Sequence, residues 1–237
     1  MTTLVSTDSD LLYPDSDGQP MSDNTKQFRW IVVLKENLEI LFADRSDVFV
    51  AGDLLWYAVE GHPEIRVAPD AMVVLGRAKG DRGSYKQWQE DNIAPQVVFE
   101  ILSPGNTVLE MSRKLLFYQR YGVLEYYVFD PDRLNLAGYI RAEGNGLEEI
   151  AQMQGWVSPL LGIRFELMKD DLTVYRPDGA RFLTSVERHE RAEQEYQRAE
   201  QEYQRAELER QRADTAEDEV RRLTARLEEL GVDSGLG

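Results

Sequence analysis

The stretch that decides the fold is "PQVVFEILSPGN", residues 95–106. Between its prolines it carries an almost unbroken apolar run, made of Val97, Val98, Phe99, Ile101 and Leu102. A run that is apolar on both faces is typical of a strand buried in the middle of a sheet. Glu100 lies inside this run, and a buried carboxylate is normally protonated, ion-paired or bound to a metal. The stretch therefore predicts both a central strand and a candidate functional carboxylate.

The composition excludes several classes of protein. The chain of 237 residues has no cysteine, two histidines and a formal charge of −16, which excludes a disulfide scaffold and a cysteine or histidine zinc site. The polar, acidic N-terminus is unlike a secretory signal, and no apolar run is long enough to span a membrane. We expect a soluble, cytoplasmic protein without a membrane partner. Its acidity disfavours broad binding to nucleic acid, so any such contact would be local.

Around the central strand, signals for helices and strands alternate. Asp23 or Asn24 can cap a helix, and strand signals then follow at 47–52, 53–60, 70–76 and 96–102. A helix over 107–122 comes next, with Thr107 and Glu110 at capping-box spacing and Gly122 at its end. Further strand signals lie at 124–130, 136–141, 147–153, 162–167 and 172–179. This order predicts an α/β (α+β) domain over residues 25–185 with one main sheet.

The two ends of the chain differ from this domain. Residues 1–24 are rich in Asp, Ser, Thr, Pro and Gly and predict a flexible arm, for which Leu11, Leu12 and Tyr13 are candidate docking residues. Residues 186–237 contain a seven-residue repeat, "RAEQEYQ", which is typical of a coiled coil. Its apolar residues recur every seven positions. One interpretation is a coiled coil that serves oligomerisation or partner binding, and the other is a single solvated helix held by charge pairs.

Two further residues can converge on Glu100. Asp70 opens the apolar run "AMVVL" of a neighbouring strand, and Lys114 lies in the helix that follows the Glu100 strand. Two carboxylates on adjacent strands can hold a hard divalent cation, and a lysine can stabilise charge on a phosphoryl group or orient the attacking water. The set suits metal-assisted phosphodiester hydrolysis. Taken singly, Asp70 could mark a strand entry, and Lys114 could pair with Glu110 on an exposed helix face.

The order "PDAMVV", "VVFEILSP" and "K..LFYQRYGVLEYYVFDP" resembles the PD-(D/E)XK, or restriction endonuclease-like, superfamily, and in particular its Uma-type restriction endonuclease family. The resemblance covers about residues 25–180. It implies a central mixed sheet flanked by helices. It also implies Asp70 and Glu100 as Mg²⁺ ligands, with the backbone carbonyl of Ile101 as a further ligand and Mn²⁺ as a possible substitute.

The chain departs from the family pattern at several positions. Leu102 stands where the usual E-x-K motif has its lysine, and in this family the lysine is thought to have moved to the following helix, which makes it Lys114. Glu110 stands where the family commonly has Asp, and is a possible accessory residue. Some superfamily members also use a glutamate of the first helix, for which Glu36 and Glu39 are both candidates.

Between the two strands lies the loop "GRAKGDRGSYKQWQEDNIAP", residues 76–95. Its cations can contact phosphates and its aromatic side chains can stack on bases. The nucleic-acid-binding candidates are Arg77, Lys79, Arg82, Lys86 and Trp88. The other reading is a solvated loop whose aromatic side chains pack on the core.

We therefore expect a Mg²⁺-dependent endonuclease that acts on DNA and is oligomerised by its C-terminal coiled coil, with a homodimer favoured because two strands need two sites. The alternative is a binding or scaffold protein that keeps the nuclease fold with weak or no catalysis. In a third reading, the coiled coil recruits another protein and the core only positions it.

Overall fold

The computed structural model describes residues 13–16, 18, 22, 24–142 and 146–230. Contacts divide the chain into two compact units, residues 1–184 and 185–237. The expected docking residues Leu11 and Leu12 lie outside the described residues. Tyr13 is buried, and its ring packs edge-on against Tyr57 with 5.2 Å between the ring centroids.

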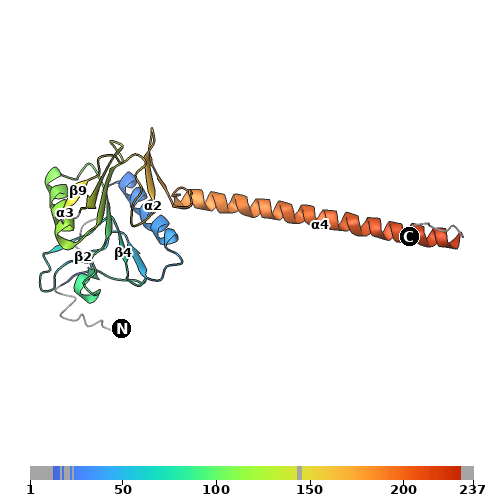
Figure 1. Cartoon of the computed structure of the whole chain (residues 1–237), viewed down its shortest axis with the longest axis horizontal. Coiled ribbons are helices and arrows are strands. Elements are labelled where there is room, and N and C mark those ends of the chain that lie inside the picture. The colour runs from blue at the N-terminus through green and yellow to red at the C-terminus, as the bar shows by residue number, and fades with distance from the viewer. Residues whose placement is uncertain (1–12, 17, 19–21, 23, 143–145, 231–237) are drawn as a thin grey trace. The chain divides into compact units, whose positions relative to one another are not determined.

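The first unit is built on a six-stranded sheet (Figure 1). The strand order is β1-β4-β6-β7-β8-β9, and only β6 and β7 run parallel. The strands are β1 (Val48–Ala51), β4 (Ala71–Leu75), β6 (Val97–Ile101), β7 (Glu125–Asp130), β8 (Asn135–Arg141) and β9 (Leu147–Glu149). The expected mixed α/β fold with a central mixed sheet is confirmed.

Five short strands form two smaller sheets. In one, β2 (Trp56–Tyr57) lies between β3 (Arg66–Val67) and β5 (Tyr85–Lys86). In the other, β10 (Arg164–Leu167) pairs with β11 (Leu172–Tyr175). The strand expected over residues 53–60 is thus only two residues long, and it does not pair with β1. Its apolar residues are buried by side-chain packing instead, as Tyr13 against Tyr57 shows.

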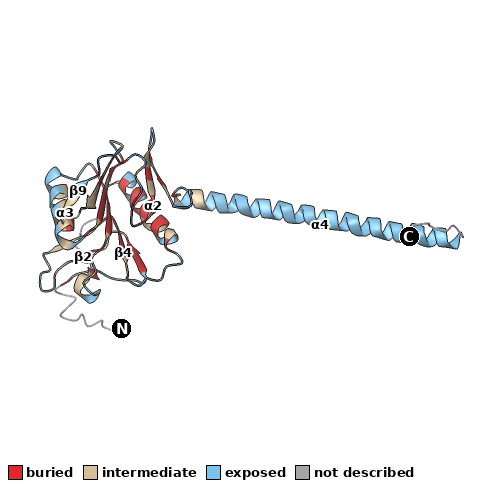
Figure 2. Cartoon of the chain, in the orientation of Figure 1, coloured by how far each residue is buried: buried red, intermediate tan, exposed pale blue. Residues whose placement is uncertain are grey.

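One helix covers each face of the main sheet. The side chains of Val97, Phe99 and Ile101 belong to the core on the side of α2 (Thr25–Leu41), whereas Val98 packs with Tyr118 of α3 (Val108–Tyr121) on the other side. Figure 2 shows the buried strands between these two helices. Because side chains alternate along a strand, Glu100 faces α3.

Local sequence signals fix the ends of both helices. Asn24 caps α2 by accepting hydrogen bonds from the backbone N–H groups of Lys26 and Gln27. Thr107 and Glu110 form the expected capping box of α3, and Gly122 ends α3 with a left-handed backbone, φ 100°. These caps set the register with which each helix presents its side chains to the sheet.

The described part of the second unit contains one helix, α4 (Ser185–Glu229), of 45 residues without a buried side chain (Figure 2). The repeat is therefore helical throughout, while a coiled coil stays a prediction. Among the described residues, none of the helices combines the length and the apolar composition needed to span a bilayer.

Candidate active site

Asp70 and Glu100 face each other across two neighbouring antiparallel strands. Ala71 of β4 pairs with Phe99 of β6, so Asp70, one residue before β4, stands opposite Glu100 at the end of the ladder. Both side chains are withdrawn from water, with 7% of Asp70 and 2% of Glu100 exposed. The sheet thus brings two carboxylates together where little solvent can screen their repulsion.

Helix α3 supplies two donors to Glu100. The ammonium Nζ of Lys114 lies 2.7 Å from Oε2 of Glu100, and the hydroxyl of Tyr118 donates a short hydrogen bond to Oε1. Residues 114 and 118 are one helical turn apart, so both side chains leave α3 on the face that covers the sheet. Lys114 therefore points into the site instead of out to Glu110, whereas Tyr118 is a site residue that the sequence analysis missed.

The environment of Asp70 favours its protonated form in the metal-free protein. Burial raises the pKa of Asp70 to about 8, and the negative charge of Glu100 acts in the same direction, with a smaller contribution from Asp53. Lys114 and a 2.6 Å hydrogen bond from the backbone N–H of Ile101 to Oδ2 act against this rise. A nearby cation would relieve the same repulsion, so the site is electrostatically suited to one.

The two donors of α3 keep their protons. Burial by itself lowers the pKa of Lys114, but the charges of Glu100 and Asp70 outweigh it and leave that pKa raised. Burial and then the charge of Glu100 raise the pKa of Tyr118 well above its ordinary value. The site therefore contains a fixed ammonium beside Glu100 at neutral pH.

A residue of the first helix also reaches the site. The side-chain amide of Gln27 donates a 2.9 Å hydrogen bond to the backbone carbonyl of Ile101, the carbonyl expected to bind the metal. Only 7% of Gln27 is exposed. Gln27 was not predicted from the sequence, because 74 residues separate it from its partner and its place three residues after the Asn24 cap indicates no second role.

The donor set fits a hard divalent cation. Carboxylate and carbonyl oxygens are the ligands that Mg²⁺ prefers, with water completing the octahedron. No cluster of three or more His, Cys, Asp or Glu side chains that could hold a metal occurs among the described residues. A cation here would thus depend on Asp70, Glu100, the Ile101 carbonyl and water.

The expected accessory glutamates have other contacts. Glu110 accepts a 3.1 Å hydrogen bond from the amide of Asn106 in addition to its part in the capping box. Glu39 is exposed and pairs with Lys35 at 2.9 Å, and Glu36 is half-buried. Their proposed roles stay predictions, and the α2 side chain shown to contact the strand end is Gln27.

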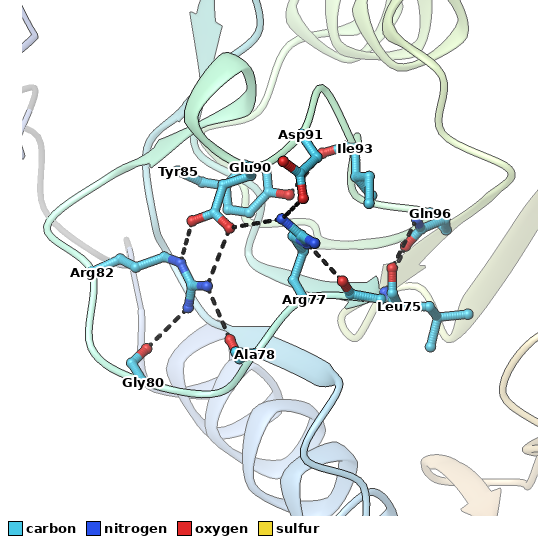
Figure 3. A network of polar contacts seen from close by, with 11 residues as sticks. Leu75, Arg77, Ala78, Gly80, Arg82, Tyr85, Glu90, Asp91, Ile93 and Gln96 are labelled. Atoms are coloured by element: carbon cyan, nitrogen blue, oxygen red, sulfur yellow. Dashed lines mark hydrogen bonds and ion pairs between the residues drawn. The ribbon is translucent and has the colours of Figure 1, made fainter.

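Much of the charge on the 76–95 loop is paired within the loop (Figure 3). Arg82 forms an ion pair with Glu90 at 2.6 Å and lies over the Phe49 ring, and Arg77 pairs with Asp91 at 2.6 Å. Among the described residues, the two lysines of the loop make no ion pair. Lys79 donates to the carbonyls of Phe42 and Ala43, and Lys86 lies over the Tyr13 ring, against which Trp88 also packs. The nucleic-acid role of this loop stays a prediction that now depends mainly on the two lysines.

A second buried carboxylate shows what distinguishes Glu100. Glu125, 1% exposed, opens β7 and accepts hydrogen bonds from the hydroxyls of Tyr127 and Ser158 and from the backbone N–H of Leu160. These neutral donors tie β7 to the 158–160 segment, which is a structural task. The sequence analysis did not single out Glu125. Burial of a carboxylate alone therefore does not identify the candidate site. Glu100 is distinguished by the opposed Asp70 and by the adjacent ammonium of Lys114.

Comparisons with known proteins identify the family of the chain. Residues 18–174 match the model of the Uma2 family, which is described as "Putative restriction endonuclease". The chain belongs to this family, and the resemblance expected from the sequence is confirmed.

One solved structure that matches part of the chain is a crystal structure of "a putative nuclease belonging to DUF820" from Anabaena variabilis ATCC 29413. The two chains share 15% sequence identity with a TM-score of 0.44, over 61% of this chain and 78% of that one. None of the curated proteins matches this chain.

Proposed function

We propose that the protein is a Mg²⁺-dependent endonuclease that hydrolyses phosphodiester bonds in DNA. The observation that carries the proposal is the opposition of Asp70 and Glu100 across β4 and β6, with the Lys114 ammonium 2.7 Å from Glu100. Membership of the Uma2 family supports the same class of activity. Mn²⁺ is expected to replace Mg²⁺, because both accept oxygen ligands.

Each residue of the site has a task in this reaction. Asp70, Glu100 and the Ile101 carbonyl would hold the cation, which when bound supplies positive charge to the phosphate and lowers the pKa of water. Lys114 places a permanent ammonium beside the scissile phosphate, where it stabilises the negative charge that develops in the transition state. Tyr118 fixes the rotamer of Glu100, and Gln27 holds the Ile101 carbonyl in place.

We propose that Lys79 and Lys86 contact the DNA backbone more strongly than Arg77 and Arg82. Both arginines already pair with carboxylates of the same loop, and a cation that is neutralised internally releases fewer counterions on binding. Trp88 would then stack on a base only if it left its packing against Tyr13.

The activity is tested with purified protein, supercoiled and linear DNA, and Mg²⁺ or Mn²⁺. Asp70→Ala, Glu100→Ala and Lys114→Ala should each lose at least about 100-fold in rate, and chelation should abolish cleavage by the wild type. Glu125→Gln is the matched control, because it removes an equally buried strand carboxylate whose partners are neutral. Equal cleavage by the wild type and the three alanine variants would reveal a contaminant and refute the proposal. Cation binding without cleavage by the wild type would favour the binding-protein alternative.

We also propose that α4 joins two copies of the chain through its C-terminal end. Val220, Leu223, Leu227 and Leu230 recur at spacings of three and four residues, and all are exposed. Cys substitution is a clean test because the chain has no cysteine. Leu227→Cys should form a disulfide-linked dimer under mild oxidation, and Leu227→Asp should lower the mass per particle in light scattering. If both variants had the mass of a monomer, the same as the wild type, the result would contradict this pairing.

A further inference from the structure

The first half of α4 carries an exposed stripe of tyrosine and alanine that differs from the leucine-rich end. Tyr196 is 72% exposed and Tyr203 is 68% exposed. They alternate, at spacings of four and three residues, with Ala192, Ala199, Ala206 and Ala213. In heptad terms the tyrosines take position a and the alanines position d. We call these six residues the Tyr/Ala seam.

Carboxylates line both sides of the Tyr/Ala seam. On one side, the e positions are Glu193, Glu200, Glu207 and Asp214. On the other side, the g positions beside the tyrosines and Arg210 are Glu195, Glu202 and Glu209. Every flanking position over three heptads is therefore acidic, and these are the positions that select a coiled-coil partner.

The two flanks differ in how their charge is compensated within the helix. On the g flank, Arg191 pairs with Glu195 at 2.9 Å, and the repeat places an arginine four residues before each of the next two glutamates. On the e flank, His189 lies 4.0 Å from Glu193, and the partners of the next two glutamates are neutral, since Gln204 donates to Glu200 and Gln211 donates to Glu207. Glu200 and Glu207 thus present negative charge along the e flank that their observed partners do not compensate.

A second copy of the chain does not fit this surface. In a parallel pair, each g position faces an e position of the partner, and in an antiparallel pair, e faces e and g faces g. Each arrangement places carboxylate against carboxylate along the whole seam. The alanines bury little apolar surface to offset this repulsion, and Arg210 interrupts the apolar stripe at its third a position.

We propose that the Tyr/Ala seam binds a helix of another protein, with apolar residues at a and d and with lysine or arginine at e and g. The basic side chains would pair with the acidic flanks and could lie over the tyrosine rings. The small alanines would allow its apolar residues to approach closely. This partner-binding role is independent of nuclease activity and of self-association through Val220–Leu230.

The probe is a synthetic peptide of about four heptads with leucine at a and d and lysine at e and g. The full chain should bind it with one-to-one stoichiometry in calorimetry, and added salt should weaken the binding. Two controls are a peptide with glutamate at e and g and a peptide of the same composition in a scrambled order. The full chain should bind neither of them.

Two matched triple variants distinguish binding at the Tyr/Ala seam from general attraction of a basic peptide to an acidic chain. Glu193→Lys/Glu200→Lys/Glu207→Lys should weaken binding of the basic peptide by at least about tenfold while circular dichroism shows an intact helix. Glu190→Lys/Asp218→Lys/Glu229→Lys changes the net charge equally but lies off the seam, and should bind as the wild type does.

Four results would overturn the proposal, and three of them concern peptide binding. They are equal binding of the scrambled peptide, equal loss in both triple variants, and no binding of the basic peptide. A fourth is efficient disulfide linkage between two copies of Ala206→Cys, because it would show that a second copy covers the seam.

Discussion

Replacing Asp70 with asparagine should change how the stability of the metal-free protein depends on pH. The unfolded chain releases the Asp70 proton near 3.8, whereas the folded protein holds it up to about 8. The folded state therefore binds more protons over this interval, so the free energy of unfolding falls as pH rises through it. One pKa unit corresponds to about 1.4 kcal/mol, so Asp70 alone lowers the stability of the wild type by about 3 kcal/mol between about pH 5 and pH 7.

The assay is urea unfolding at several pH values in the presence of a chelator. Asp70→Asn cannot release a proton, yet its side-chain oxygen can still accept the hydrogen bond of the Ile101 N–H. Its stability should therefore fall by about 3 kcal/mol less than that of the wild type over the same interval. The difference in slope is the measured quantity, because the substitution also has a pH-independent effect on stability.

Asp47→Asn is the matched control for this measurement. Asp47 is exposed, and a hydrogen bond from Arg45 holds its pKa below the ordinary value, so it stays ionised throughout the interval. This variant should keep the wild-type slope. Parallel stability curves for the wild type and Asp70→Asn would refute the reasoning about Asp70.

The same proton should compete with a divalent cation. A cation binds the carboxylate form, so the affinity of the wild type for Mg²⁺ should rise with pH up to about 8, with protons released on binding. Calorimetry in two buffers of different ionisation enthalpy measures this release. Affinity that does not change between about pH 6 and pH 8 would contradict a shared site at Asp70.

Three further substitutions test the supporting contacts. Tyr118→Phe removes a donor to a buried carboxylate and should lower the free energy of unfolding by about 1–3 kcal/mol in urea titrations; an unchanged midpoint would show that this bond contributes nothing. Gln27→Leu leaves the Ile101 carbonyl without its amide donor, so it should lower the free energy of unfolding by about 1 kcal/mol and weaken Mg²⁺ binding in calorimetry. Wild-type stability together with wild-type Mg²⁺ affinity would show that Gln27 is not part of the site. Gly122→Ala places a Cβ in the left-handed conformation at φ 100° and should cost about 1 kcal/mol in thermal unfolding, while Gly146→Ala, with open space around it, serves as the neutral comparison.

The sequence predicted the parts of the fold that local signals encode. Asn24, the Thr107–Glu110 capping box and Gly122 mark helix ends through contacts within a few residues, and the structure has these ends. The strand predicted over residues 53–60 was too long. The apolar residues of this segment are buried by contacts with distant segments, which local signals do not report. β1 and β2, which follow each other in the chain, belong to different sheets. The backbone N–H of Asp53 instead donates to the carbonyl of Pro69, at the entry to β4.

The candidate site shows the same division between local and distant information. Asp70, Glu100 and Lys114 could be found because a strand, its neighbour and the next helix are each recognisable in the sequence. Gln27 could not, because it meets the site across a long separation in the chain. The pairing of Arg82 with Glu90 was equally hidden, because cations and carboxylates alternate in the loop and their partners depend on how it folds.

The connection from β6 through α3 to β7 determines which side chains can approach Glu100. β6 and β7 are parallel neighbours, and connections of this kind are almost always right-handed, which fixes the face on which the helix lies. Leu102 follows Glu100 by two residues and lines a cavity of about 280 Å³ together with Met111 and Leu115 of α3. Position 102 therefore faces α3, the helix whose Lys114 pairs with Glu100. A lysine at position 102 would therefore enter the space between β6 and α3, on the side from which Lys114 already approaches Glu100.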